Sequence, residues 1–278
     1  MNKNLKKILI KTKKQVFTEI SGNNSSSLKG EGYDFLELRE YEFGEDIKNI
    51  DWTISAKMNT PYVKVFHAQK ELNINILPIL NGSMIFGTKK IKQDLVTEVC
   101  SLLAFSSIKQ GDPFSSFIVN EKFQNITKRS KKLASVASMS EQIFNYNPIG
   151  KEIDYKLLCN ESFKLIKMKS ILFLIGDFIG IEGFDLKLLS QKHEVFVIII
   201  RDIFEENPQE LGNISLVDTN NGLKFEGIID KYSIKDYKAY IKKNDHDLFY
   251  HLQKCNVRFT KIYTHEEAAS KIITLVSK

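Results

Sequence analysis

Two short, almost entirely apolar segments constrain the fold more than any other feature of the sequence. They are residues 171–175 and 195–200, and residues 184–191 between them have helical spacing. A strand that is apolar on both faces is typical of a parallel sheet covered by helices on each side. Because strands and helices alternate from residue 72 onward, the sequence predicts an α/β fold with a doubly wound, mostly parallel sheet.

The remaining elements follow from periodicity and turn residues. Further strands are expected at residues 62–66, 72–80, 114–119 and 257–263, and further helices at residues 131–144, 153–167, 232–254 and 266–276. Thr88 is expected to cap another helix, which ends at Gly111. Asn220-Asn221-Gly222 predicts a β-hairpin excursion at about residues 203–230. Pro78 argues against a central strand, since proline cannot donate to the ladder, unless it lies near the strand's carboxyl end.

Composition restricts the class of protein. A chain of 278 residues, 42% hydrophobic and 27% charged, suits one or two globular domains. It contains no run of about 18 apolar residues, the length that a membrane-spanning helix needs. Lysines interrupt the apolar residues near the N-terminus, whereas a signal peptide has a continuous apolar region. Three cysteines without a Cys-x-x-Cys pair favour reduced thiols. Together these features predict a cytoplasmic location.

The net charge of +6 equals the six lysines that precede the first acid, Glu19. Apolar residues at helical spacing among them predict an amphipathic basic helix. Such a helix either docks its apolar stripe on the domain, which we favour, or makes peripheral membrane contact through residues 3–20. Because the rest of the chain is nearly neutral, no nucleic-acid partner is expected.

Residues 1–70 consist of the first helix and an extension. The extension contains several closely spaced acids, an arginine and the only tryptophan of the chain. The extension holds Gly30-Glu31-Gly32, Leu38-Arg39-Glu40-Tyr41, Gly44-Glu45-Asp46 and Ile50-Asp51-Trp52, and Ser83-Met84-x-Phe86-Gly87 and Arg201-Asp202 follow in the domain of residues 71–278. In order and spacing these motifs resemble the domain-of-unknown-function 58 family, whose members carry a von Willebrand factor A-like domain.

The resemblance implies a candidate metal-ion-dependent adhesion site at the carboxyl ends of the strands. Such sites hold a divalent cation with an Asp-x-Ser-x-Ser loop, a Thr and a later Asp. The matching positions here are Ile79, Asn81 and Ser83, then Asp154 beside the Thr position, and Asp177. Isoleucine supplies no oxygen, and Mg²⁺ binds best to several charged oxygen ligands. We therefore expect a degenerate site without a cofactor, in which Asn81 and Ser83 cap the following turn and Asp177 accepts from its amides.

Two further groups of residues are candidates for other sites. Arg39, Glu40, Tyr41, Asp46, Asp51 and Trp52 form either a partner interface or an internal cluster, in which Arg39 pairs with Asp46 or Asp51 and Trp52 packs on the sheet. His251 and Cys255, with Asp247 one turn earlier, lie on a predicted helix, and a polar helix face is favoured there over a zinc site.

Three functions follow as hypotheses. The resemblance implies a non-catalytic protein-interaction module that serves a MoxR-type AAA+ ATPase and other von Willebrand A-like proteins as an adaptor in protein assembly or maturation. The second is a metal-assisted hydrolase that uses the crevice near Asp177. The third is a membrane-surface protein attached by its basic N-terminal helix.

Overall fold

The computed structural model describes residues 2–19, 35–66, 71–210, 212–219 and 222–277. Its contacts divide the chain into two units: residues 24–71 form a small unit, and residues 1–23 with 72–278 form a large one. The first helix therefore belongs with the large unit, whereas the expected boundary at residue 70 grouped it with the extension.

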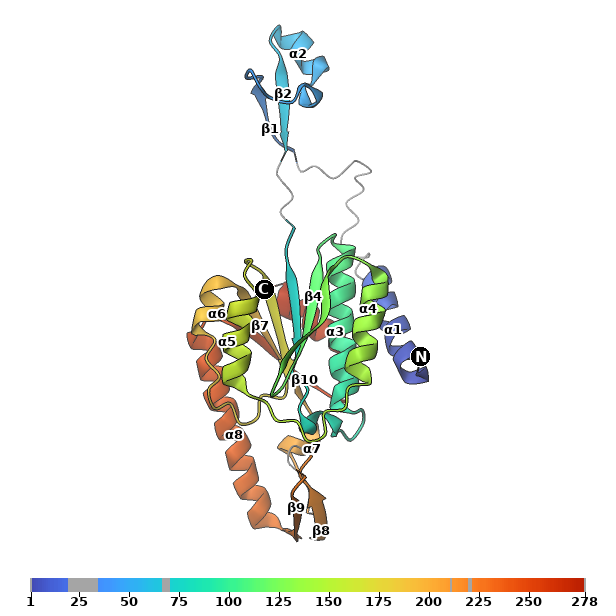
Figure 1. Cartoon of the computed structure of the whole chain (residues 1–278), viewed down its shortest axis with the longest axis vertical. Helices are drawn as coiled ribbons and strands as arrows, with labels where there is room; N and C mark the ends of the chain where they lie inside the picture. Colours follow the sequence, from blue (N-terminus) through green and yellow to red (C-terminus); the bar gives the residue numbers. More distant parts are fainter. Residues whose placement is uncertain (1, 20–34, 67–70, 211, 220–221, 278) are drawn as a thin grey trace. The chain divides into compact units, whose positions relative to one another are not determined.

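The large unit is built around a six-stranded sheet with the order β10-β7-β6-β3-β4-β5 (Figure 1). Its strands are β3 (Ile74–Pro78), β4 (Phe114–Val119), β5 (Phe123–Ser130), β6 (Ile171–Gly176), β7 (Glu194–Arg201) and β10 (Arg258–Tyr263). All neighbouring strands are parallel except β5, which pairs antiparallel with β4 at one edge. The α/β fold with a mostly parallel sheet is confirmed, and β5 was not predicted.

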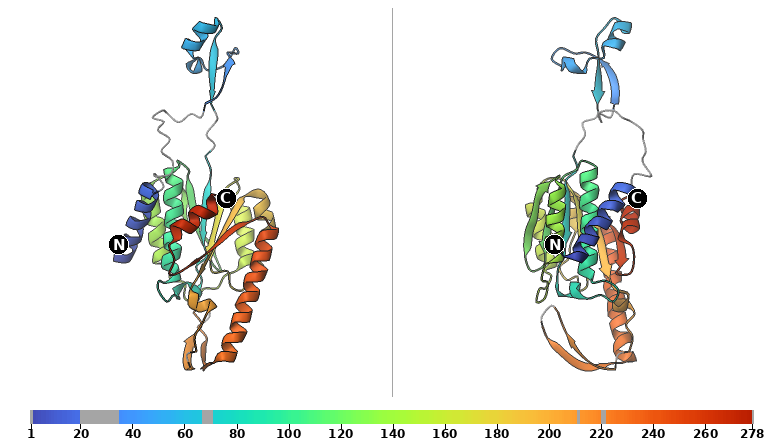
Figure 2. Two further views of the ribbon diagram at one scale, coloured as in Figure 1. Left: turned by 180° about the vertical axis from the view of Figure 1, so that it is seen from behind. Right: turned by 90° about the vertical axis from the view of Figure 1, so that its right-hand side faces the viewer.

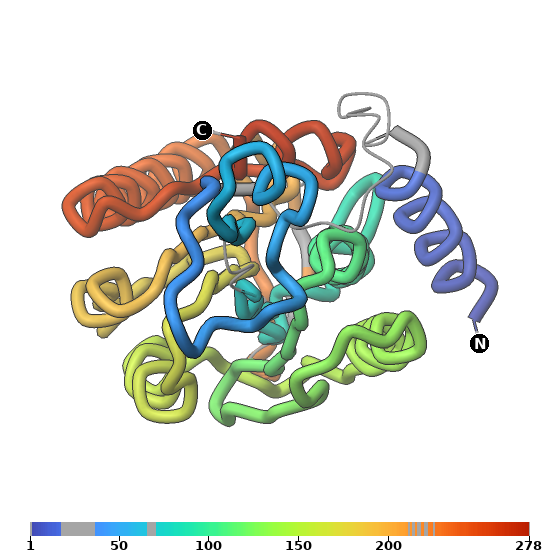
Figure 3. Tube along the Cα trace, turned by 90° about the horizontal axis from the view of Figure 1, so that it is seen from above, coloured from blue at the N-terminus to red at the C-terminus, as the bar shows by residue number. Residues whose placement is uncertain are grey.

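Helices cover both faces of the sheet, with α1, α3, α4 and α9 over one face and α5, α6 and α8 over the other (Figure 3). Their bounds are α1 (Lys3–Lys14), α3 (Lys92–Lys109), α4 (Leu133–Phe144), α5 (Tyr155–Leu165), α6 (Lys187–Lys192), α8 (Lys231–Lys254) and α9 (Ala268–Val276). Successive residues of β6 enter opposite cores: Phe173 packs on the α3 side and Leu174 on the α5 side. This two-sided burial explains the apolar runs.

Helix α1 docks on the large unit, as favoured from its pattern. Leu5 and Ile8 are buried, and α1 packs against α3 and α4. Lys11 forms an ion pair of 2.8 Å with Glu98 of α3, and a short π-helix, η1 (Gln15–Glu19), continues the chain. The apolar stripe is thus used within the protein.

The carboxyl edge of the sheet carries the elements that build the candidate site (Figure 1). After β3 comes a 3-10 turn, η4 (Gly82–Ile85), and after β7 come α7 (Ile203–Glu206) and a hairpin of β8 (Gly212–Val217) and β9 (Lys224–Ile229). The N-terminal half of α8 extends past this edge beside the hairpin (Figure 2). The predicted hairpin is confirmed, although Asn220 and Asn221 of its turn lie outside the described residues.

Three local predictions are settled by hydrogen bonds and backbone geometry. Thr88 does not cap α3, because Ile91 is the N-cap and Thr88 instead bonds to Asp202. Gly111 does follow the helix, with φ of +82°. Pro78 is the last residue of β3, as its missing N–H requires, and Ile79 resumes the ladder by donating to the Ile175 carbonyl at 2.7 Å.

The small unit is a two-stranded antiparallel ribbon with two short helical turns. Its elements are β1 (Phe35–Glu40), η3 (Ile47–Asn49), α2 (Trp52–Met58) and β2 (Tyr62–Phe66). Asp51 caps α2 by accepting from two backbone amides, and Asn59 ends the helix with φ of +57°. Strand β2 was predicted, whereas β1 was not.

Candidate functional site

The ends of β3 and β6 bring Asn81, Ser83 and Asp177 together. The Ser83 hydroxyl bonds to Oδ2 of Asp177, and it lies 3.0 Å from Oδ1 of Asn81. Asn81 precedes η4 but makes no side-chain capping bond. The prediction that Asn81 and Ser83 cap this turn is therefore wrong, since the Ser83 hydroxyl bonds to the side chains of Asn81 and Asp177. Asp177 was expected to accept from the turn's amides, but among the described residues it accepts only from the Ser83 hydroxyl and the Lys92 ammonium.

A lysine that the sequence patterns did not single out completes this cluster. Lys92, in the first turn of α3, has a side chain with 0% exposure, and its Nζ lies 3.3 Å from Oδ2 of Asp177. The same ammonium pairs with Glu205 of α7. A cation near a helix N-terminus opposes the helix dipole, and a buried one is costly unless it is paired. The two carboxylates supply that pairing, so Lys92, Asp177 and Glu205 form a charge triad in which Lys92 and Asp177 are buried and Glu205 is partly exposed.

The charge state of Asp177 follows from this geometry. Burial favours its neutral form, but the Lys92 ammonium, the Ser83 hydrogen bond and the Arg201 guanidinium outweigh burial and hold the pKa of Asp177 below 3.8. Asp177 is therefore ionised at neutral pH. Its Oδ1 has no hydrogen-bond partner among the described residues.

The other two positions of the expected metal site do not contribute. Ile79 is fully buried, and a Cβ built on Gly176 would lie 2.9 Å from its Cβ, so Ile79 fills the space beside the β6 terminus. Asp154 is exposed and caps α5, where it accepts from the Leu157 amide at 2.8 Å. Only three of the four predicted ligands, Asn81, Ser83 and Asp177, come together.

These donors do not fit a divalent cation. Mg²⁺ needs several charged oxygens in octahedral geometry, whereas the cluster offers one carboxylate and two neutral side chains. Oδ2 of that carboxylate already accepts from Ser83 and from the Lys92 ammonium. A cation would have to displace an ammonium that is held by two acids.

A second buried cation adjoins the charge triad. Arg201, at the end of β7, has 0% exposure and donates to Oδ1 of Asp245 at 2.9 Å. Lys261 bridges the other oxygen of Asp245 to Glu206 at 2.6 and 2.7 Å. The Nε and Nη1 atoms of Arg201 lack partners within the described ranges. The sequence analysis noted the Arg201-Asp202 motif but did not predict that both side chains are buried.

Asp202 fastens the loops of this edge together. Its carboxylate accepts from the backbone and hydroxyl of Thr88 and from the hydroxyl of Thr264, and it caps α7 in a capping box with Glu205. Burial favours protonation, but these hydrogen bonds outweigh it and lower the pKa of Asp202. The Asp202 carboxylate thus joins three segments: the chain after β3, the chain after β10, and helix α7.

An apolar groove opens beside the charge triad, between α7, the hairpin and the N-terminal half of α8. Its volume is about 400 Å³, and Glu205 lies at its edge. The apolar groove is lined mainly by Phe86, Phe204, Pro208, Ile228, Ile234 and Tyr237. The rings of Phe86 and Phe204 lie 6.1 Å apart.

The six interface candidates all lie in the small unit. Arg39 pairs with Glu45 and, at 3.7 Å, with Glu42, so its predicted pairing with Asp46 or Asp51 is wrong. Asp46 caps η3, and Asp51 caps α2 and pairs with Lys64 at 2.8 Å. Glu40 accepts from the Tyr62 hydroxyl at 3.4 Å.

Within the small unit the Trp52 side chain is 67% exposed. Its expected packing on the sheet stays a prediction. Trp52 lines a shallow hollow of about 590 Å³ within the small unit, together with Tyr41, Ile47 and Pro61. An exposed tryptophan at a hollow favours the interface interpretation of this block.

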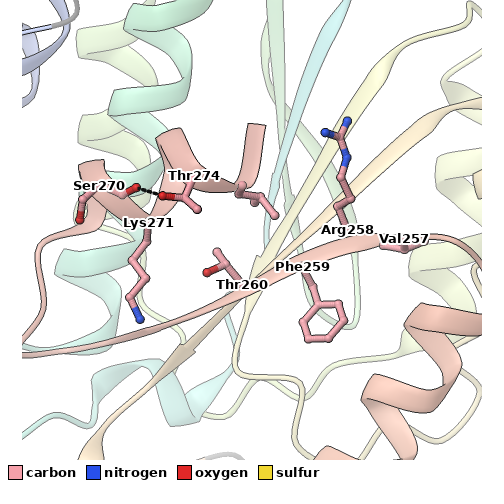
Figure 4. Close-up of a pocket in the computed structure, with 8 residues that line it drawn as sticks. Val257, Arg258, Phe259, Thr260, Ser270, Lys271 and Thr274 are labelled. Atoms are coloured by element: carbon pink, nitrogen blue, oxygen red, sulfur yellow. Dashed lines mark hydrogen bonds between the residues drawn. The ribbon is translucent and has the colours of Figure 1, made fainter. Parts of the chain in front are cut away.

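Two other clusters carry less chemistry. Asp185, not Asp247, joins His251 and Cys255 with ligand atoms within 4.8 Å, but Nε2 of His251 already accepts from the Leu186 amide and burial raises the pKa of the Cys255 thiol. A hollow beside the edge strand β10 is lined by Thr260, Lys271 and Thr274 (Figure 4). It contains no group with a buried, unpartnered charge among the described residues.

The comparisons with known proteins agree with the motif-based resemblance. The profile of the family described as "Protein of unknown function DUF58" matches residues 37–247. Uncharacterized proteins of Mycobacterium tuberculosis and Mycobacterium bovis are 21% identical over 283 residues, covering 98% of this chain and 88% of theirs.

Solved structures with similarity include the conserved hypothetical protein BatB from Bacteroides thetaiotaomicron, at 11% identity and a TM-score of 0.48, covering 74% of this chain and 97% of that one. The SpRpn10 VWA domain is 8% identical with a TM-score of 0.39, covering 74% of this chain and 94% of that one. Within the described residues no helix is long and apolar enough to span a bilayer.

Proposed function

The chain belongs to the DUF58 family, and from that premise we propose that it is a non-catalytic protein-interaction module, an accessory subunit of a MoxR-type AAA+ ATPase in protein assembly or maturation. The observation that carries the proposal is the charge triad. Asp177 is paired with the chain's own Lys92, so among the residues that the structure describes this strand-end site keeps no free carboxylate pair for water activation or metal binding.

Two surfaces support binding of other polypeptides. The small unit presents exposed Trp52 beside a hollow, and the large unit presents the apolar groove. Aromatic side chains that are exposed around concave surfaces are typical anchors of protein interfaces. The ATPase itself is proposed from the family resemblance.

Affinity capture tests the proposal. The tagged full-length chain is expressed in its native cell, and bound proteins are identified by mass spectrometry. We expect a MoxR-type ATPase and von Willebrand A-like proteins at amounts comparable to the bait, and reduced recovery with Trp52→Ala. Met58→Ala, which truncates another exposed apolar residue of α2, is the matched control. Recovery of no ATPase with the intact chain contradicts the proposed function.

A further inference from the structure

The N-terminal half of α8 carries charge beside the apolar groove. Lys231, Lys235, Lys238 and Lys242 recur at helical spacing and line one shallow hollow, which they share with Ile234. Ile234 also lines the apolar groove, so this lysine row runs along one side of it. At 1.5 Å per residue, the lysine row is about 16 Å long.

The lysine row is largely uncompensated. Lys231 has Glu210 at 3.9 Å, an exposed pair that contributes little. In the part of the chain that the structure describes, no carboxylate lies within 4.0 Å of Lys235, Lys238 or Lys242. Four like charges on one helix face repel one another, and bound acids would relieve that repulsion.

The apolar groove is also exposed on its outer wall. Ile228 of the hairpin, which lines it, is 61% exposed. Its inner wall is fixed, because α7 is held by the Asp202 capping box and by the Glu205–Lys92 pair. A fixed wall lowers the entropic cost of binding a side chain there.

We propose that the apolar groove and the lysine row together bind an acidic, amphipathic segment of a partner protein. One or two of its large apolar side chains enter the groove, and its Asp or Glu side chains lie along Lys235, Lys238 and Lys242. A concave site of about 400 Å³ suits individual side chains, whereas a lipid surface needs a flat or convex apolar face. This inference deepens the proposed function and rests on it for the class of partner.

A peptide-display selection tests the inference and does not require the partner protein to be identified first. Random 16-residue peptides are selected on the immobilised full-length chain, and binding of the recovered peptides is measured by fluorescence anisotropy at two salt concentrations. We expect sequences in which acids alternate with Phe, Leu or Trp at helical spacing, and affinity that falls as salt rises.

Two variants and their controls locate the site. Ile228→Asp should weaken peptide binding at least tenfold by placing a carboxylate in the groove wall, and Lys235→Glu/Lys238→Glu/Lys242→Glu should do the same by reversing the row. The matched control, Lys3→Glu/Lys6→Glu/Lys7→Glu, makes the same charge change on exposed residues of α1 and should bind normally. Circular dichroism verifies that each variant is folded.

Three results overturn the inference: recovered peptides without acidic residues, equal binding by the α8 and α1 variants, or no recovered peptides. Flotation with phosphatidylserine vesicles is run in parallel, and lysine-row-dependent flotation without peptide binding assigns the surface to lipid instead. If the ATPase is captured but the substitutions in the groove and the lysine row leave peptide binding unchanged, the groove inference fails and the proposed function stands. If no ATPase is captured but these substitutions weaken peptide binding, the ATPase is rejected as the partner and the groove inference stands.

Discussion

The ammonium of Lys92 lies 3.3 Å from Oδ2 of Asp177, and both side chains are buried at the carboxyl edge of the sheet. In von Willebrand A-like domains with a functional adhesion site, the same edge holds a divalent cation. Here a covalently attached positive charge, fixed at the start of α3, neutralises the acid. The buried pair thereby joins the start of α3 to the end of β6.

Replacement of Lys92 by Met should lower the free energy of unfolding by about 3–5 kcal/mol at pH 7, because it leaves the buried Asp177 carboxylate without its cation. Lys151→Met, which breaks an exposed pair with Glu121, should change the free energy of unfolding little. Urea denaturation measures both. An equal loss of unfolding free energy in the two variants would contradict the buried pairing of Lys92 with Asp177.

The same comparison has a defined pH dependence. In the wild type the pKa of Asp177 is below 3.8, so its stabilising contribution is present above that pH and is lost as pH falls through the folded-state pKa. In Lys92→Met burial dominates and raises this pKa, so the variant loses stability as pH rises above about 4. The stability difference between the two proteins should therefore shrink from pH 7 toward pH 3.5. A constant difference contradicts the pairing.

Removing the built-in cation should also create weak metal binding. Lys92→Ala leaves the Asp177 and Glu205 carboxylates with the oxygens of Asn81 and Ser83, a donor set closer to what Mn²⁺ requires. Electron paramagnetic resonance should detect millimolar-range Mn²⁺ binding in Lys92→Ala but none in the wild type or in Lys92→Ala/Asp177→Asn. Tight binding by the wild type would favour the hydrolase hypothesis.

His193 should make the protein sensitive to mild acid. The ring is buried, and burial, aided by the charge of Lys192, lowers the pKa of His193 to about 4. Because the unfolded chain binds the proton more readily, stability is lost as pH falls from about 6.5 to about 4, by about 3 kcal/mol at most. His193→Phe should flatten this part of the profile, whereas substitution of exposed His246 by Gln should not.

Docking of α1 is tested by a pair of substitutions on one helix. Leu5→Ala should lower stability by about 2 kcal/mol or more, since Leu5 is fully buried, while Ile10→Ala should change it little, because Ile10 is 59% exposed. Wild-type protein should not float with anionic vesicles through α1, because the apolar stripe is buried on α3 and α4. Flotation that is lost on deletion of residues 2–14 would instead support the membrane hypothesis.

The fold was predictable because its signals are local. The apolar runs of β6 and β7 and the helix between them are visible in contiguous stretches of the chain. Strand β5 was missed because it lies at the sheet edge, where polar residues such as Gln124 and Asn125 are exposed and the apolar pattern is weak.

The site was less predictable because its charges meet across the chain. Lys92 and Glu205 are 113 positions apart, and in the sequence a lysine at the start of a helix cannot be told from an exposed one. In the small unit, five acids follow Arg39 between residues 40 and 51, and the backbone turn directs it to Glu45 rather than Asp46 or Asp51. The resemblance placed Ile79 at the position of the first acid, and the structure shows that this side chain is fully buried, which the sequence analysis did not predict.

The most direct test is a crystal structure of the wild-type protein grown in millimolar MnCl₂, with anomalous diffraction recorded at the manganese edge. We expect no anomalous peak within coordination distance of Asp177, and the Lys92 ammonium in contact with that carboxylate. A manganese ion at full occupancy, held by Asn81, Ser83 and Asp177 with Lys92 turned away, would contradict the claim that Lys92 takes the place of the metal.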